Sequence, residues 1–183
     1  NENIFFLNTY GSLYAIDTKS MEIKWFLNLN LTTNLNLGNI FDSNQVINDG
    51  NNIVLNSNYF TYVIDIYTGK IKHKKNFSSK IQSLIVDGYL FTISKNNFLI
   101  CTNIDNGKIV YSYNINQKIS EYLKIKEEKV EFQNFLIANN KILIFLKSSY
   151  LLTFTIYGEL EDIIELPSKI KTKAIIVDSS ILY

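Results

Sequence analysis

The 183-residue chain has no arginine and contains only one cysteine, one proline, one tryptophan and one histidine. All 18 basic residues are therefore lysines, and with 17 acidic residues they leave a net charge of +1. This balance argues against a nucleic-acid-binding protein, because such binding depends on clustered basic charge and on arginine side chains that read guanine. The single cysteine, Cys101, cannot form an intrachain disulfide, so the sequence does not indicate a redox compartment.

Long apolar segments are also missing. The longest apolar runs, Ile142–Leu146 and Ala174–Val177, are far shorter than the ~20 residues that a membrane-spanning helix needs. The chain begins at Asn1 without the charged and apolar regions of a signal peptide, although a processed chain would look the same. Aromatic residues make up 14% of the chain and β-branched residues are abundant, and both favour strands.

An eleven-residue pattern occurs four times along the chain. Its places hold a small residue, any residue, an acid, two of any kind, Ser or Thr, a turn residue, Lys or Glu, two of any kind, and an aromatic. The copies are Ala15–Trp25, Val63–His73, Cys101–Tyr111 and, in a degenerate form, Leu152–Asp162. A pattern repeated in this way indicates that one local structure is built several times.

Short alternating runs bounded by turn residues surround each copy and predict strands, for example at residues 89–93 and 98–103. The complete unit has four antiparallel strands, and it is 38 to 51 residues long between equivalent turn residues. Blades of four strands around a central channel define a β-propeller. We therefore predict an all-β propeller of about four blades in one domain, residues 1–183. Its units are residues 1–44, 45–80, 81–132 and 133–173, and residues 174–183 begin another blade.

Two connections are longer than the rest. Asn28–Asn44 has little charge and four leucines (Leu29, Leu31, Leu35 and Leu37), so it is either a contact surface for a partner or packs on its own blade. Asn114–Glu131 fits two structures. Ile119, Leu123 and Val130 have the spacing of a short amphipathic helix, whereas two apolar pairs on either side of Glu127-Glu128 fit a hairpin. We favour the hairpin.

The pattern A-x-D-x-x-[ST]-G-x-x-x-W resembles the tryptophan-docking repeat of quinoprotein-like (PQQ-type) β-propellers. Ala15, Asp17, Ser20 and Trp25 match it, and the turns Thr68-Gly69-Lys70 and Asn106-Gly107-Lys108 match its centre. The resemblance covers essentially the whole chain. It is specific for the fold and says little about activity.

Each part of the pattern has a physical reason. Glycine at the turn adopts a positive φ without steric strain, and the carboxylate of Asp17 or Asp65 can accept backbone N–H groups there. The last aromatic residue can reach an adjacent blade and lie on its small residue. Met21 in the glycine place predicts either a different turn or strain of about 1 kcal/mol. The last place reads Trp25, His73, Tyr111 and Asp162, so we expect docking to weaken along the chain.

Two groups of proteins carry this repeat. Quinoprotein alcohol and glucose dehydrogenases use a whole propeller, Ca²⁺, PQQ and often a disulfide between adjacent cysteines. The other group is BamB, the non-catalytic lipoprotein of the outer-membrane β-barrel assembly machinery. The chain is more similar to BamB, because it has short blades and no adjacent cysteines. This resemblance implies half of an eight-bladed propeller, a scaffold with protein partners, and a periplasmic, outer-membrane-associated location.

The reactive residues stand in no catalytic pattern, and we predict no catalytic, cofactor-binding or metal site. The alternatives are a fragment of a PQQ- and Ca²⁺-dependent dehydrogenase and a generic propeller adaptor or sensor. We interpret His73 as a packing residue, Cys101 as an inert buried thiol, and Asp17 and Asp65 as turn caps. Lys70, Lys72, Lys74 and Lys75 resemble a basic patch, but Lys70, Lys72 and Lys74 share one strand face, which we interpret as the solvated face of an outer strand. Because a half-propeller exposes blade faces, we also expect self-association through them.

Overall fold

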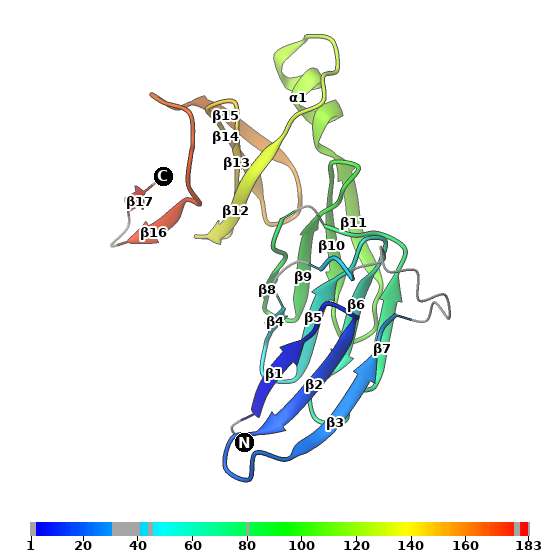
Figure 1. Ribbon diagram of the computed structural model, residues 1–183. Coiled ribbons are helices and arrows are strands. Elements are labelled where there is room, and N and C mark those ends of the chain that lie inside the picture. The colour runs from blue at the N-terminus through cyan, green and yellow to red at the C-terminus, as the bar shows by residue number, and fades with distance from the viewer. Residues whose placement is uncertain (1–2, 31–40, 44–45, 80, 178–179, 183) are drawn as a thin grey trace. The chain divides into compact units, whose positions relative to one another are not determined.

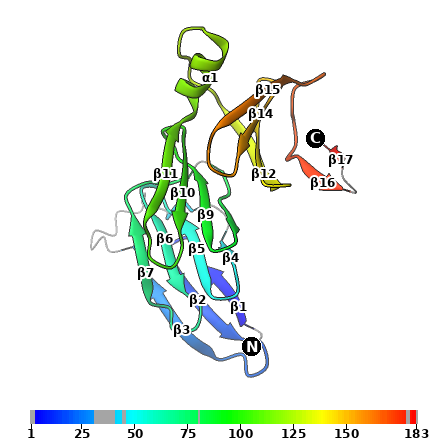
Figure 2. The ribbon, with the colours of Figure 1, turned by 180° about the vertical axis from the view of Figure 1, so that it is seen from behind.

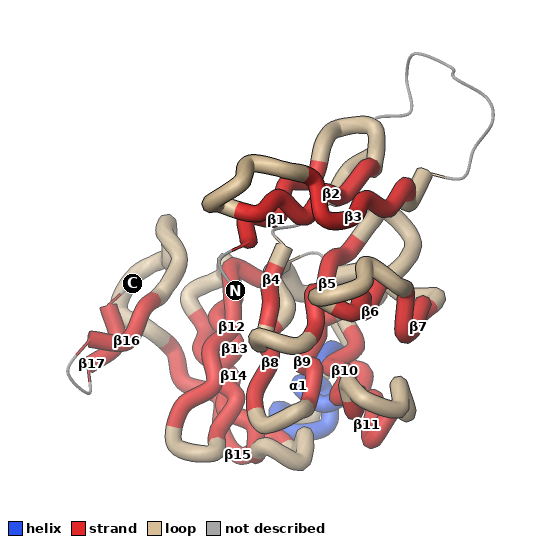
Figure 3. The backbone as a smooth tube through the Cα atoms, turned by 90° about the horizontal axis from the view of Figure 1, so that it is seen from below, coloured by secondary structure: helices blue, strands red, loops and turns tan. Residues whose placement is uncertain are grey.

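The computed structural model describes residues 3–30, 41–43, 46–79, 81–177 and 180–182. Nearly all of their regular structure is antiparallel strand, with one helix (Figure 3), which confirms the predicted all-β class. The chain divides into two compact units, Asn1–Ser78 and Ser79–Tyr183, and each is described by itself. No helix in these ranges is long and apolar enough to cross a membrane.

The first unit contains two antiparallel sheets whose strands follow one another in sequence (Figure 1). Blade 1 consists of β1 (Asn3–Leu7), β2 (Ser12–Asp17) and β3 (Ile23–Asn28). Blade 2 consists of β4 (Ile47–Asn48), β5 (Asn52–Asn56), β6 (Thr61–Asp65) and β7 (Ile71–Lys75). The two blades share one core, formed by Leu13, Leu29, Ile53, Leu55, Tyr62, Ile64 and Ile66.

The second unit contains two four-stranded antiparallel sheets and a hairpin. Blade 3 is β8 (Leu84–Val86), β9 (Tyr89–Ile93), β10 (Phe98–Asn103) and β11 (Ile109–Asn114). Blade 4 is β12 (Phe132–Ala138), β13 (Lys141–Leu146), β14 (Tyr150–Thr155) and β15 (Leu160–Glu165), and the hairpin is β16 (Ile175–Val177) and β17 (Ser180–Leu182). Blades 3 and 4 share a core that includes Phe91, Leu99, Cys101, Ile142, Leu152 and Phe154.

The same irregularity occurs between the last two strands of every blade. The pairing register shifts once in each, at Ala15/Ile16, Val63/Ile64, Cys101/Thr102 and Thr153/Phe154. Such a shift is a β-bulge, which bends the strand and increases its twist. Its recurrence at one position shows that the four copies of the pattern build one structure.

In the structure, the fourth copy of the pattern lacks one turn residue that the other copies have. In blade 2 the turn is closed by Gly69 N, which donates to Asp65 O four residues back. In blade 4 Gly158 N donates to Thr155 O, only three residues back. The turn is therefore one residue shorter, and Thr155 holds the place of the acid. Phe154, which an ungapped alignment puts there, is fully buried in the core.

The segment after β11 forms a helix, α1 (Ile115–Leu123), so the predicted hairpin is wrong (Figure 2). Asn114 caps the helix, because its side-chain oxygen accepts hydrogen bonds from the backbone N–H groups of residues 116 and 117. Ile115 and Ile119, one turn apart, are both buried. Lys124 ends the helix in a left-handed conformation with φ 56°. A cap and a buried pair one helical turn apart thus outweigh the alternating pattern further along.

The other long connection is described only at its ends. Leu31, Leu35 and Leu37 lie outside the described residues, so a contact surface there stays a prediction. Leu29 is 6% exposed and belongs to the core of the first unit. Phe41 packs against that core, and its N–H donates to Thr9 O. The ends of the segment therefore pack on their own unit.

Candidate interaction surfaces

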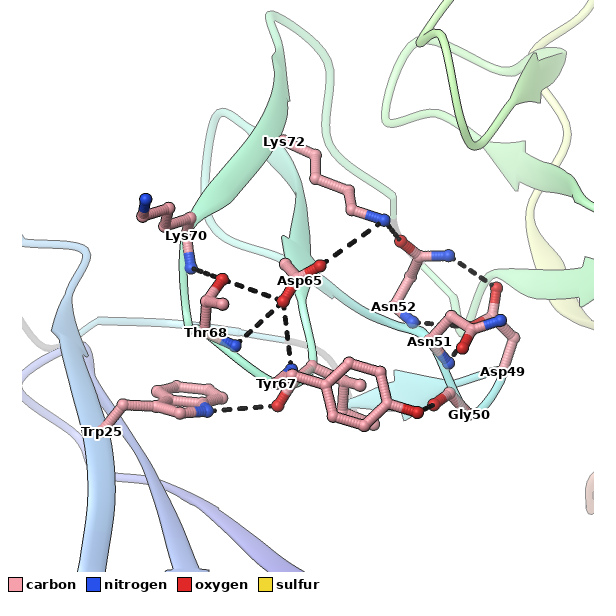
Figure 4. A network of polar contacts seen from close by, with 11 residues as sticks. Trp25, Asp49, Gly50, Asn51, Asn52, Asp65, Tyr67, Thr68, Lys70 and Lys72 are labelled. Carbon is pink, nitrogen blue, oxygen red and sulfur yellow. Dashed lines mark hydrogen bonds and ion pairs between the residues drawn. The ribbon is translucent and has the colours of Figure 1, made fainter.

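The ring in the last place of blade 1 lies on the turn of blade 2 (Figure 4). Trp25 Nε1 donates to Ile66 O at 3.1 Å, and a Cβ placed on Gly69 would lie 2.5 Å from the indole ring. Gly69 has φ +68°, so glycine serves both the backbone conformation and the close approach. The predicted contact between adjacent blades is present, but it is made at the turn glycine and not at the small residue.

An equivalent contact occurs in the second unit. The hydroxyl of Tyr111 donates to Ile156 O at 2.8 Å. A Cβ on Gly158 would lie 2.7 Å from the ring of Tyr111 and 2.6 Å from that of Tyr113, which stacks on it. Burial raises the pKa of the Tyr111 phenol above its ordinary value, so the hydroxyl stays protonated and can donate. Docking thus persists in the third copy, whereas Asp162 in the fourth copy has no ring to dock.

The two acidic residues of the pattern are turn caps, as predicted. Asp65 Oδ1 accepts hydrogen bonds from the backbone N–H groups of residues 67 and 68 and from the Thr68 hydroxyl (Figure 4). These contacts, the Thr68 hydroxyl first, hold the pKa of Asp65 below its ordinary value. Asp17 Oδ1 accepts from the backbone of residues 19 and 20, and Lys24 Nζ lies 2.7 Å from its other oxygen. Lys24 is the main cause of the lowered pKa of Asp17.

The structure also describes the other residues that the sequence analysis considered for chemistry, Cys101, His73 and the lysines near β7. Cys101 is 3% exposed, and burial raises the pKa of its thiol to about 11, which agrees with an inert buried thiol. Lys70, Lys72 and Lys74 are exposed on β7 and just before it. His73 pairs with Val63 in the sheet of blade 2 and is partly exposed. Among the described residues, no three His, Cys, Asp or Glu side chains form a group that could hold a metal ion.

A groove of about 280 Å³ lies beside α1 in the second unit, and it is mainly apolar. Its walls come from the helix, from the loop after it and from blade 4, and they include Ile119, Leu123, Ile125, Val130, Tyr150 and Ile163. Leu123 and Ile125 are 44% and 54% exposed. The sequence did not indicate this groove, because it exists only when the segment after β11 is helical.

A second apolar surface covers one face of blade 1, and we call it the blade 1 outer face. It consists of Ile4, Phe6, Tyr14, Ile16, Ile23 and Phe26. Phe6, Tyr14 and Phe26 form a ladder across the three strands, with ring centroids 6.4 Å and 5.9 Å apart. Ile4, Phe6 and Phe26 are 53%, 54% and 64% exposed. Contiguous exposed apolar area of this kind marks interaction surfaces.

Four-stranded sheets with a shared bulge, and rings docked on the turn of the next sheet, are blades of a β-propeller. No family model matches the chain, and no curated protein is similar to it in sequence. Solved structures are similar to it in fold. BamB from Moraxella catarrhalis is 8% identical, with 99% of this chain and 63% of that protein covered and a TM-score of 0.51.

Two further structures have the same fold at equally low identity. The computationally designed Ika8 protein is 11% identical, with 99% of this chain and 52% of Ika8 covered and a TM-score of 0.71. Quinohemoprotein alcohol dehydrogenase from Comamonas testosteroni is 7% identical, with 89% of this chain and 33% of the enzyme covered and a TM-score of 0.69. The chain therefore spans less than two thirds of each protein, and these similarities establish the β-propeller fold.

Proposed function

We propose that the chain is a non-catalytic scaffold for protein–protein interaction, a BamB-like component of outer-membrane β-barrel protein assembly in the periplasm. The groove beside α1 carries this proposal. It is built by an insertion, α1 and the loop after it, that the four-stranded blade pattern does not need. Loops and insertions on a rigid scaffold are common places for binding sites. The fold similarity to BamB supports the same role.

The groove suits an apolar segment of a partner protein. Leu123 and Ile125 lie at its rim, while Ile119 is buried at its inner side. A space of about 280 Å³ accommodates a few apolar side chains, which is the usual anchor of a peptide-binding groove. Lys126 and Glu128 in the loop carry opposite charges beside the apolar walls, so they can orient the partner.

Binding to purified components of the outer-membrane barrel assembly machinery tests the proposal. We expect one component to bind the immobilised chain, and Leu123→Asp or Ile125→Asp to weaken that binding by at least about tenfold. Both side chains are exposed, so the variants should fold. Tyr59→Asp is the matched control, because Tyr59 is 75% exposed and lies in the first unit. Binding of no component would leave the generic adaptor or sensor, and unchanged binding by both groove variants would exclude the groove.

The fold similarity to the dehydrogenase favours a second candidate function, that of a fragment of a PQQ- and Ca²⁺-dependent enzyme. The described residues offer no group of three His, Cys, Asp or Glu side chains for its ion. We therefore derive no catalytic step through PQQ or Ca²⁺. Isothermal calorimetry with PQQ, with and without Ca²⁺, separates the two candidates: the scaffold predicts no binding heat, and metal-dependent binding of PQQ would support the enzyme.

A further inference from the structure

Each blade ends in an outer strand, and its bulge residue can be compared across the four blades. At the register shift described above, the strand pairing skips one residue of β3, β7, β11 and β15. In blade 3 this residue is Val110, which is 56% exposed. In the other blades it is charged and forms an ion pair, namely Lys24 with Asp17 at 2.7 Å, Lys72 with Asp65 at 3.8 Å, and Glu161 with Lys141 at 2.9 Å.

The rest of β11 is uncharged as well. The strand reads IVYSYN, and its first residue, Ile109, is 51% exposed. By comparison, β3 contains one lysine, β7 contains three lysines and β15 contains three acidic residues. Charged side chains, lysine above all, keep exposed edge strands from pairing with another chain. Among the outer strands of the four blades, β11 is therefore the least protected against the addition of a strand.

The backbone of β11 has groups available for such pairing. β11 stands at the end of its sheet and pairs with β10 (Figure 2). Across this pair Ile115 N donates to Asn97 O. Bonded residues alternate along an antiparallel pair, so Tyr113 and Tyr111 also bond to β10. Ser112, which lies between them and is exposed, therefore directs its N–H and C=O away from β10.

We propose that two copies of this chain associate through β11, with the two strands antiparallel about a two-fold axis. The contact is self-complementary, because each strand offers outward N–H and C=O groups to the other. Like charges on directly opposite residues are destabilising, and self-pairing of β7 or β15 would bring lysines or acidic residues together. Self-pairing of β11 brings uncharged side chains together and can bury Ile109 and Val110.

The proposed contact is separate from the groove beside α1. The walls of the groove come from α1, the loop after it and blade 4, whereas β11 is the outer strand of blade 3. The inference therefore does not depend on the proposed function. It also uses a strand edge, and not the blade faces considered in the sequence analysis.

Sedimentation velocity of the 183-residue chain over a dilution series tests the inference, and a dimer that dissociates on dilution is expected. Ser112→Pro removes the outward N–H and keeps the bonds to β10, since proline is tolerated on an edge strand where its N–H would face solvent. Val110→Lys introduces the residue that blades 1 and 2 have at this place. Each change occurs twice in a symmetric dimer and should weaken it by at least about tenfold.

A control variant and a second measurement make the test specific. Tyr157→Lys is the matched control, because Tyr157 is 75% exposed on a turn of the same unit, and it should leave the dimer unchanged. Hydrogen exchange reports the contact directly. The Ser112 amide should exchange more slowly at high protein concentration than at low concentration, because only the dimer gives it a hydrogen-bond acceptor.

Two results would overturn the inference. One is a wild-type chain that stays monomeric at every concentration. The other is a dimer that neither Ser112→Pro nor Val110→Lys weakens, since such a dimer forms through another surface. Circular dichroism checks that each variant is folded. If Ser112→Pro does not fold, Val110→Lys and the exchange of the Ser112 amide in the wild-type chain decide the question.

Discussion

Replacing Gly69 by alanine tests the contact between blades 1 and 2 most directly. Two features of the structure favour glycine at position 69: its positive φ of +68°, and the ring of Trp25, which leaves no room for a Cβ. Gly50 provides a matched control, because it has φ +92° and no atom within 4 Å of its would-be Cβ. Gly50→Ala therefore introduces backbone strain alone, and Gly69→Ala introduces strain and a clash with Trp25.

The two effects have different magnitudes. A side chain forced into the left-handed region costs about 1–2 kcal/mol of stability. Forcing an extra carbon into a packed contact costs about 1–3 kcal/mol more. We therefore expect Gly50→Ala to destabilise the first unit by about 1–2 kcal/mol and Gly69→Ala by about 2–5 kcal/mol. The additional destabilisation by Gly69→Ala should disappear when Trp25 is replaced by alanine.

Urea unfolding followed by circular dichroism measures these free energies in a double-mutant cycle of Trp25→Ala and Gly69→Ala. The expected coupling is about 1–3 kcal/mol, with Gly69→Ala costing no more than Gly50→Ala once Trp25 is absent. If Gly69→Ala is as mild as Gly50→Ala in the wild-type background, or costs the same without Trp25, the ring does not dock as described. Trp25 is the sole tryptophan, so its fluorescence reports the state of this contact in the single glycine variants.

Further predictions concern single positions. Met21→Gly should stabilise the chain by up to about 1 kcal/mol in urea unfolding, because relief of strain exceeds the added freedom of the unfolded chain. The pKa of Asp17 is lowered on folding, so its contribution to the free energy of unfolding is present above the unfolded pKa of 3.8 and is lost as pH falls through the lower folded pKa. Asp17→Ala should therefore reduce the dependence of the free energy of unfolding on pH at acid pH. Asn114→Ala should destabilise α1 by about 0.5–2 kcal/mol, measured by hydrogen exchange of the helix amides. Cys101 should react with a thiol reagent only as fast as the second unit opens, and urea should accelerate the reaction.

Much of the fold could be predicted because the pattern that builds a blade is local. The predicted strands at residues 89–93 and 98–103 coincide with β9 and β10. Gly69 and Gly107 marked their turns correctly, because a positive φ favours glycine in any context. Met21 adopts the same conformation as these glycines, so the predicted strain, and not a different turn, is the outcome. The number of domains in the chain stays a prediction.

Two features could not be predicted from the sequence, because they depend on more than the local pattern. The one-residue deletion before Gly158 moved the acid's place to Thr155, and only the hydrogen bonds of the folded turn reveal that shift. Helix α1 depends on the burial of Ile115 and Ile119, whereas the sequence shows only their spacing. The groove beside α1 was missed for the same reason. By contrast, the sequence predicted that Trp25 contacts an adjacent blade, but it did not identify the residue that Trp25 contacts, because that residue lies on another blade.

The cap of the repeated turn requires only an oxygen that accepts backbone hydrogen bonds. Asp65, Asn103 and Thr155 fulfil this requirement with three different side chains. Mutation can therefore exchange the residue there repeatedly while the chain still reverses direction at the same point. Such tolerance preserves the architecture while the sequence changes, so this chain can have the same fold as BamB although the two are only 8% identical.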